Sequence, residues 1–146
     1  MIPLAHQKVI RDRMALADPR PQNPNLDGCC VEEISVNEAS TVILTYEYLG
    51  TMPNATLACY GLRSATSNLL GAVCFNRGGG PRALDVLGPE YRFPIVVLAR
   101  GCCVHWAPRN AASFLIRHAC RLASKAYGWV AFIAYADPEA GELGTV

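Results

Sequence analysis

The sequence predicts a mixed α/β (α+β) domain with a partly antiparallel sheet and flanking helices. A strand, a connection, a helix and a strand follow one another between positions 95 and 135, an order typical of a crossover between parallel strands. Farther upstream, two β-like runs flank a short polar connection, which indicates an antiparallel hairpin. The chain has 146 residues, 51% hydrophobic and 17% charged, enough for one domain with a substantial core.

The N-terminal residues 1–28 are expected to form an arm ahead of a folded domain at residues 29–146. The stretch Asp18–Asp27 is rich in Pro and Asn, which favours a loop or an extended segment. The first residues mix charged and apolar side chains, which disfavours a signal peptide, and no apolar run approaches the roughly 20 residues of a membrane span. We therefore expect a cytoplasmic protein without a membrane partner.

The folded domain is predicted to begin with a short strand and a helix. Val31–Ile34 is the strand candidate. Ser35 followed three residues later by Glu38 has the form of a capping box, and apolar residues then recur with helical spacing. A first helix is therefore predicted over Val36–Tyr48, where Gly50 stops it.

Three further strands are predicted from apolar runs. Ala55–Leu62 and Leu69–Phe75 form the hairpin. Asn76–Pro81 contains three consecutive glycines and is expected to be a loop. Pro94 then opens Ile95–Leu98, a continuous apolar run of the kind that is buried on both faces of a sheet. This run is expected to be the central strand.

A second helix and a last strand follow the central strand. Asn110 is expected to cap the helix, which runs to about Tyr127 and ends at Gly128 in the left-handed conformation. The predicted buried face of this helix consists of Leu115, Ala119, Leu122 and Ala126. Trp129–Tyr135 is the predicted last strand.

Charge is distributed unevenly along the chain. The net charge is +1, yet residues 61–136 carry nine basic and two acidic side chains. In the second helix, Arg117, Arg121 and Lys125 recur every four residues and form a basic stripe. Such a stripe is either a solvated surface or a surface that attracts a polyanion.

The cysteine pattern favours free thiols. There are seven cysteines, an odd number, and most lie within apolar segments, which suits a reducing compartment better than a disulfide framework. The adjacent pairs Cys29-Cys30 and Cys102-Cys103 lack the two-residue gap of a zinc knuckle, and the histidines supply no matching spacing. We expect no metal site.

A set of residues at characteristic spacing follows the central strand and the last strand. They are Arg100, Pro108, Arg109, Asn110, Ser113, Ala136, Asp137, Pro138, Gly141, Gly144 and Thr145. In an open α/β sheet, Arg100, Ser113 and Asp137 would all lie near the carboxyl ends of neighbouring strands, and we expect them close together. This pattern, with the segment Ala39–Pro53 that contains Tyr46–Gly50 at the end of the first helix, resembles the Mom family of phage proteins over residues 31–146.

The resemblance implies a fold similar to the GNAT acyltransferases. It also implies an enzyme that transfers a carbamoylmethyl-type group to adenine N6 in DNA, which protects phage DNA from restriction in the host cell cytoplasm. The catalytic residues implied by the resemblance are Asp137, Ser113, Arg100 and Tyr48. Arg100 and Asn110 would bind the donor, whose identity is unknown.

Each of these residues has an alternative structural role. The planar fork of Arg100 would hold a phosphate or carboxylate of the donor, or else would form an internal ion pair with Asp137. Asp137 would orient the attacking amine, or else would form a turn. Ser113 would stabilise developing charge, or else would bond its own helix backbone. Tyr48 would line the site, or else would pack in the core.

DNA is the expected partner, and its contacts are expected from the second helix and the loop before it. Arg109 and the basic stripe would meet phosphates. Trp106 would stack on a base, or else would pack beneath the helix.

Two other functions remain open. One is a GNAT-type N-acyltransferase acting on a small amine. Ordinary acetyl-coenzyme A use is not supported, because Gly101–Arg109 lacks the Gly-rich turn that usually holds the coenzyme. The other is a non-catalytic DNA-binding or structural module.

The chain differs from the usual pattern of the family in two places. The family commonly has a His-Tyr pair where this chain has Glu47 and Tyr48, and it usually continues beyond the position of Val146. We therefore expect the domain to be incomplete at its C-terminus. Trp129–Tyr135 would then be an exposed sheet edge, which favours a homodimer.

Overall fold

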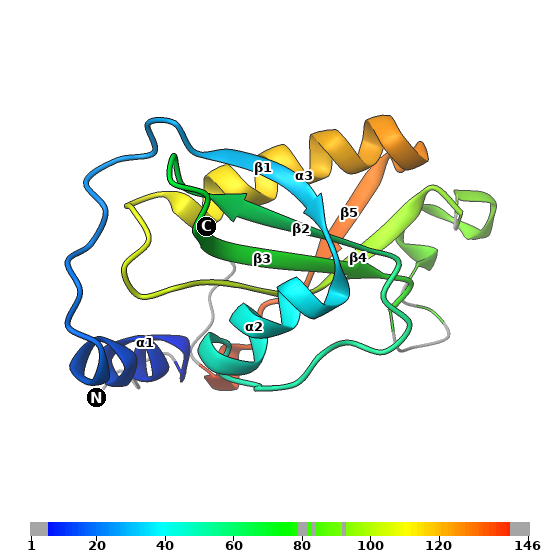
Figure 1. Ribbon diagram of the computed structural model, residues 1–146. Coiled ribbons are helices and arrows are strands. Elements are labelled where there is room, and N and C mark those ends of the chain that lie inside the picture. The colour runs from blue at the N-terminus through cyan, green and yellow to red at the C-terminus, as the bar shows by residue number, and fades with distance from the viewer. Residues whose placement is uncertain (1–5, 79–81, 83, 92, 141–146) are drawn as a thin grey trace.

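A five-stranded sheet lies at the centre of the structure, with its strands in the order β1-β2-β3-β4-β5 (Figure 1). The computed structural model describes residues 6–78, 82, 84–91 and 93–140. The strands are β1 (Cys30–Ile34), β2 (Ala58–Arg63), β3 (Leu69–Asn76), β4 (Ile95–Cys103) and β5 (Ala131–Ala134). Neighbours among β1 to β4 pair antiparallel, whereas β5 pairs parallel with β4. The predicted mixed α/β class is confirmed.

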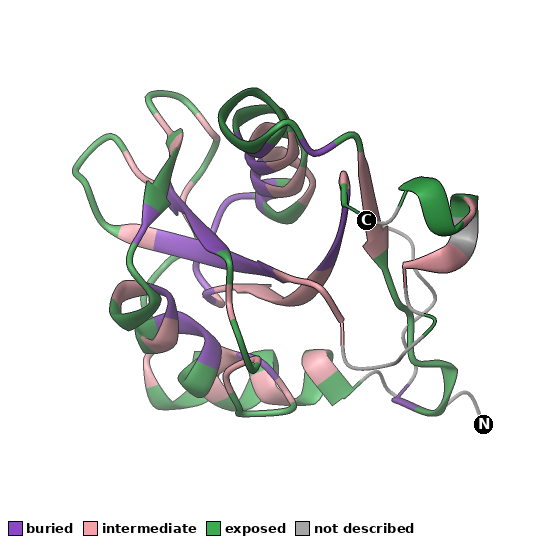
Figure 2. Cartoon of the chain, turned by 90° about the vertical axis from the view of Figure 1, so that its right-hand side faces the viewer, coloured by how far each residue is buried: buried purple, intermediate pink, exposed green. Residues whose placement is uncertain are grey.

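Two helices cover opposite faces of this sheet. Figure 2 shows α2 (Val36–Tyr46) on one face and α3 (Ala111–Tyr127) on the other. A third helix, α1 (His6–Ala17), packs against α2. Short 3-10 turns are η1 (Asp85–Leu87), η2 (Pro89–Tyr91) and η3 (Pro138–Ala140). Because α3 joins β4 to its parallel neighbour β5, the predicted crossover is confirmed.

Local hydrogen bonds set the ends of the two packed helices. The capping box is confirmed, because the Ser35 hydroxyl accepts from the Glu38 N–H at 3.1 Å and the Glu38 carboxylate accepts from the Ser35 N–H at 3.0 Å. α2 ends at Tyr46, two residues earlier than predicted, because Glu47 adopts an extended backbone. α3 ends at Gly128 with φ +71°, as predicted.

The buried face of α3 differs from the prediction. Its buried residues are Ala111, Leu115, Ala119 and Ala123. Leu122 is 39% exposed and Ala126 is also exposed. Small side chains face the sheet because the helix lies close to it. The close approach is visible at Gly71 of β3, where an added Cβ atom would lie only 3.1 Å from Leu115 Cδ2 of α3.

β4 is longer than the predicted strand Ile95–Leu98. Arg100 and Gly101 interrupt the apolar run in the sequence, yet both pair with β3. β5 pairs only with Ile95–Leu98, so β4 continues for five residues past it. We call these residues, Ala99–Cys103, the β4 extension. Arg100 therefore lies within a strand and not in the predicted connection.

The predicted hairpin is confirmed, with β2 beginning three residues later than expected. At its centre, Cys59 and Cys74 lie directly opposite each other. Their Sγ atoms are 3.1 Å apart, both side chains are buried, and both thiols are free.

α1 corrects the expectation that residues 1–28 form only an arm. None of its residues is buried, so the sequence carries little amphipathic signal. The helix is held by Gln7, whose side-chain amide donates to the Tyr46 carbonyl and accepts from the Tyr48 N–H at 3.1 Å. Asp18–Asp27 contains neither helix nor strand, as expected. The expected strand entry at residues 141–146 and the loop residues 79–81 lie outside the described residues.

Candidate functional site

Arg100 lies on the α2 side of the sheet, where it meets a buried carboxylate. Its Nε atom is 3.4 Å from Oε2 of Glu47, the residue that follows α2. The guanidinium also donates to the Thr51 carbonyl at 3.1 Å, to the Thr51 hydroxyl at 3.3 Å and to the Ala99 carbonyl at 2.7 Å. Among the described residues, the ion-pair partner of Arg100 is thus Glu47 and not Asp137, which corrects the alternative considered above.

Glu47 is the only charged side chain counted as buried in the described part of the chain, with an exposed fraction of 8%. Its Oε1 atom accepts from the Gly101 N–H at 3.3 Å, while Oε2 is buried without a hydrogen-bond partner. Burial raises the pKa of Glu47 to about 7, against the opposing effects of the Gly101 N–H and the Arg100 charge. This carboxyl therefore changes its protonation state near neutral pH.

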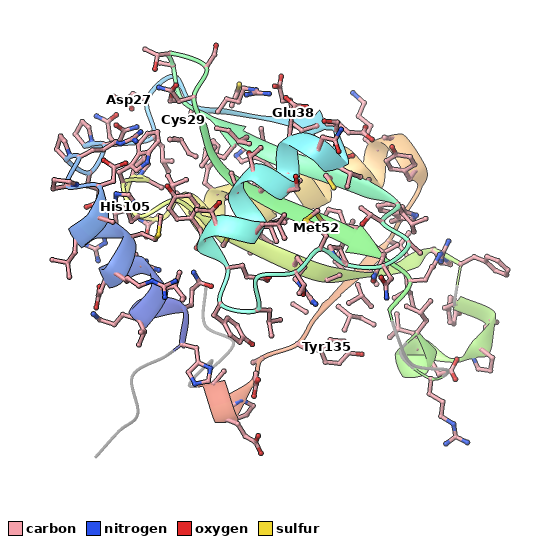
Figure 3. All side chains as sticks on the ribbon, turned by 60° about the horizontal axis from the view of Figure 1, so that its bottom comes forward. Asp27, Cys29, Glu38, Met52, His105 and Tyr135 are labelled. Atoms are coloured by element: carbon pink, nitrogen blue, oxygen red, sulfur yellow. The ribbon has the colours of Figure 1, made fainter. Side chains whose placement is uncertain are left out.

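The end of α2, the start of α1 and η3 lie together on this side of the sheet (Figures 1 and 3). The Tyr48 ring meets the His6 ring edge to face, with 5.6 Å between centroids. With Val9 and Ile10, these rings line an open hollow of about 220 Å³. Tyr48 is half-buried here, and its ring faces the hollow and not the central core.

Asp137 lies on the exposed turn that leads into η3. Its Oδ1 atom accepts from the N–H groups of Glu139 at 3.0 Å and Ala140 at 3.3 Å. This is the turn-forming geometry considered above as an alternative. The side chain is exposed, so these bonds orient the carboxylate without burying it.

Ser113 and Asn110 belong to the α3 side of the sheet. Ser113 is the third residue of α3 and stands four residues before Arg117, on the outward-facing stripe of the helix. The basic stripe itself is exposed. The expectation that Ser113 lies with Arg100 is therefore wrong, because the chain crosses to the other face of the sheet between β4 and α3.

The expected side-chain cap of α3 is also wrong. Asn110 occupies the position before the helix but makes no cap hydrogen bond with its side chain. Its φ is +64°, in the left-handed region, whereas a capping side chain normally comes from an extended backbone.

Trp106 packs inside the protein, and Arg109 is exposed. The Trp106 side chain is 8% exposed, and the Arg20 guanidinium lies 4.7 Å from the centroid of its ring. The packing alternative is thus the arrangement present, and the ring is not displayed for stacking on a base.

The family assignment comes from a comparison with known proteins. The chain matches the model of the Mom protein family over residues 28–146. The chain belongs to the Mom protein family. No curated protein matches it. The matched region of this Mom family protein contains Glu47, Tyr48, Arg100 and Asp137, whereas α1 precedes it.

The described part of this Mom family protein contains neither a membrane-spanning helix nor a cluster of metal ligands. No helix there is both long and apolar enough to cross a membrane. No three His, Cys, Asp or Glu side chains in those same residues gather in a way that could hold a metal ion.

Glu47 is the site residue that the sequence analysis of this Mom family protein missed. Its signal is its helical phase, because Ala39, Ile43 and Glu47 follow one another at intervals of four and the first two are buried. A charged residue in phase with a buried stripe predicts a buried charge, which needs a partner. The partner, Arg100, is 53 positions away and could not be identified from local spacing.

Proposed function

We propose that this Mom family protein modifies DNA by transferring a carbamoylmethyl-type group to the N6 amino group of adenine, so that phage DNA resists restriction in the host cytoplasm. The observation that carries the proposal is the family match over residues 28–146. The match includes Tyr48 after the end of α2, Arg100 in β4 and Asp137 directly before η3.

The transfer forms a bond between N6 and the methylene carbon of the donor. The bond from that carbon to the leaving group breaks, and N6 loses one proton. Because the N6 lone pair is delocalised into the ring, positioning has to supply much of the rate. In this proposal Arg100 holds an anionic group of the donor, Asp137 accepts a hydrogen bond from the amino group, and Tyr48 lines the site.

DNA phosphates are proposed to contact the α3 side, while the reacting adenine leaves the stack and passes the edge of the sheet to reach Arg100 on the α2 side. The basic stripe and Arg109 contact phosphates, and Ser113 continues the same stripe by one helical turn. Asn110, which was expected above to bind the donor, is proposed instead to join these phosphate contacts, because it lies at the start of α3. Adenine N6 is stacked and paired in a duplex, so the base must leave the stack or come from an open strand, at a cost of a few kcal/mol.

Nucleoside mass spectrometry of DNA from cells that express the protein tests this function. The wild type and the surface variant Glu38→Gln are expected to yield modified adenine. Arg100→Lys and Asp137→Asn are expected to reduce it by about a hundredfold or more, because each removes a positioned charged group.

The outcomes separate the competing functions. Unmodified adenine throughout, with the wild type folded, rejects the proposal. Calorimetric binding of coenzyme A without salt-dependent DNA binding would favour the acyltransferase of small amines. DNA binding without modification, unchanged in Asp137→Ala, would favour the non-catalytic module.

A further inference from the structure

The contact between Glu47 and Arg100 is one-sided. Oε2 of Glu47 approaches the guanidinium at its Nε atom, at 3.4 Å. Arginine–carboxylate pairs frequently use two parallel hydrogen bonds of about 2.7–2.9 Å. Here the carboxylate leaves both terminal nitrogens to other partners.

Those other partners are neutral. Nη1 donates to the Ala99 carbonyl and Nη2 donates to the Thr51 hydroxyl. Of the five N–H groups of an arginine, three are thus used, and one on each terminal nitrogen has no partner among the described residues. The guanidinium retains capacity for an acceptor that binds both nitrogens.

The two side chains differ in their access to solvent. Arg100 is 24% exposed at its side chain, and Glu47 is 8% exposed. Arg100 lies in the β4 extension, past the last residue that pairs with β5. A ligand can therefore touch Arg100 without touching Glu47.

We propose that Glu47 is a positioning residue, which holds the Arg100 guanidinium so that its two unused N–H groups bind a carboxylate or phosphate oxyanion. The inference rests on the proposed function in one respect: it takes this oxyanion to belong to the group donor. Burying Glu47 with an incomplete set of hydrogen bonds costs free energy. The need to fix the Arg100 guanidinium for a ligand would explain why this costly arrangement is kept.

A positioning role and a purely electrostatic role predict opposite effects of removing the carboxylate. If Glu47 only offsets the charge of Arg100, its loss leaves a stronger positive charge, and anions bind equally well or more tightly. If Glu47 positions Arg100, its loss lets the guanidinium move, and binding weakens.

Acetate and inorganic phosphate are the probes, and the arginine Nε–Hε NMR signals of the full chain are the readout. The Arg100 signal is assigned by its absence in Arg100→Lys. We expect it to shift saturably with at least one probe; a shift with phosphate alone indicates a phosphate ligand, and a shift with acetate alone indicates a carboxylate.

The variants then test the position of Glu47. Glu47→Ala is expected to weaken the apparent Kd about tenfold, because the variant loses the carboxylate beside Nε that limits movement of the guanidinium. Glu47→Gln, which keeps the shape and an acceptor oxygen, is expected to stay within about threefold. The matched control is Glu38→Gln, which removes the charge of a glutamate within α2 that pairs with a different arginine, Arg63.

Unchanged or tighter binding in Glu47→Ala overturns the inference, as does the lack of any shift at Arg100 with either probe. If Glu47→Ala does not fold, Glu47→Asp decides, because its shorter side chain draws the carboxylate away from Nε and must also weaken binding. Anion binding that follows these expectations, without adenine modification, contradicts the proposed function and leaves this inference intact.

Discussion

The buried carboxylate of Glu47 makes the stability of the fold depend on pH. Burial raises the pKa from 4.5 to about 7, so the folded state retains a proton that the unfolded chain has already lost. This contribution is fully present below about pH 4.5 and is lost as the pH rises through about 7. One pKa unit corresponds to about 1.4 kcal/mol, so the loss is on the order of 3 kcal/mol.

Glu47→Gln is expected to remove this dependence. The melting temperature of the wild type should fall between roughly pH 5 and pH 8, whereas that of the variant should change less. Circular dichroism at constant ionic strength measures both. Glu38→Gln is the control, because hydrogen bonds from Ser35 and Arg63 lower the pKa of Glu38 and place its titration below this range. Equal slopes for the wild type and Glu47→Gln would contradict the assignment.

At the scale of elements, α1 depends on its contact with α2. Gln7 uses both ends of its side-chain amide to hold the backbone where α2 ends. Gln7→Ala is expected to speed hydrogen exchange in α1 several-fold while the sheet stays protected, because α1 has no buried residue of its own. Arg13→Ala, at an exposed position of the same helix, is the matched control. Unchanged exchange in α1 after loss of Gln7 would show that other contacts hold the helix.

Elements that carry their own local signal could be predicted from the sequence. The capping box at Ser35, the left-handed stop at Gly128 and the polar connection of the hairpin each rest on neighbouring residues. The missed features depend on distant partners. α1 needs α2, and the β4 extension needs β3 to pair with Arg100 and Gly101.

The same distinction applies to the candidate site. Arg100 could be singled out by its resemblance to the family motif, but its contact with Glu47 is set by how α2 lies across the sheet. Ser113 was misplaced because the residues between β4 and α3 do not reveal that the chain crosses to the other face. Spacing along the sequence cannot distinguish the two faces there.

For the whole molecule, the sheet separates two surfaces. Arg100 is on the α2 side, and the basic stripe of α3 is on the other. α1 also carries exposed basic residues, Arg11 and Arg13, on the α2 side. DNA that approaches α3 and DNA that approaches α1 would therefore depend on different charges.

Double Arg→Glu variants on α3 and on α1 distinguish DNA binding at these two surfaces. Replacing Arg117 and Arg121 by Glu is expected to weaken DNA binding and to lower the slope of log K against log salt by about 0.9 for each phosphate that is no longer neutralised. Replacing Arg11 and Arg13 by Glu is expected to have a much smaller effect. Fluorescence anisotropy over a range of salt concentrations measures both slopes. The reverse result would place the DNA on the α2 side.

The rate at which the Cys59 and Cys74 thiols are alkylated would report local opening at the centre of the sheet. They are 1% and 0% exposed, whereas Cys30 at the start of β1 is exposed. An alkylating reagent can therefore modify Cys30 in the native protein, but it reaches the inner pair only when the packing that buries these two side chains opens. Adducts on the peptides that contain Cys59 and Cys74, followed over time in the unaltered chain, record how often that packing opens.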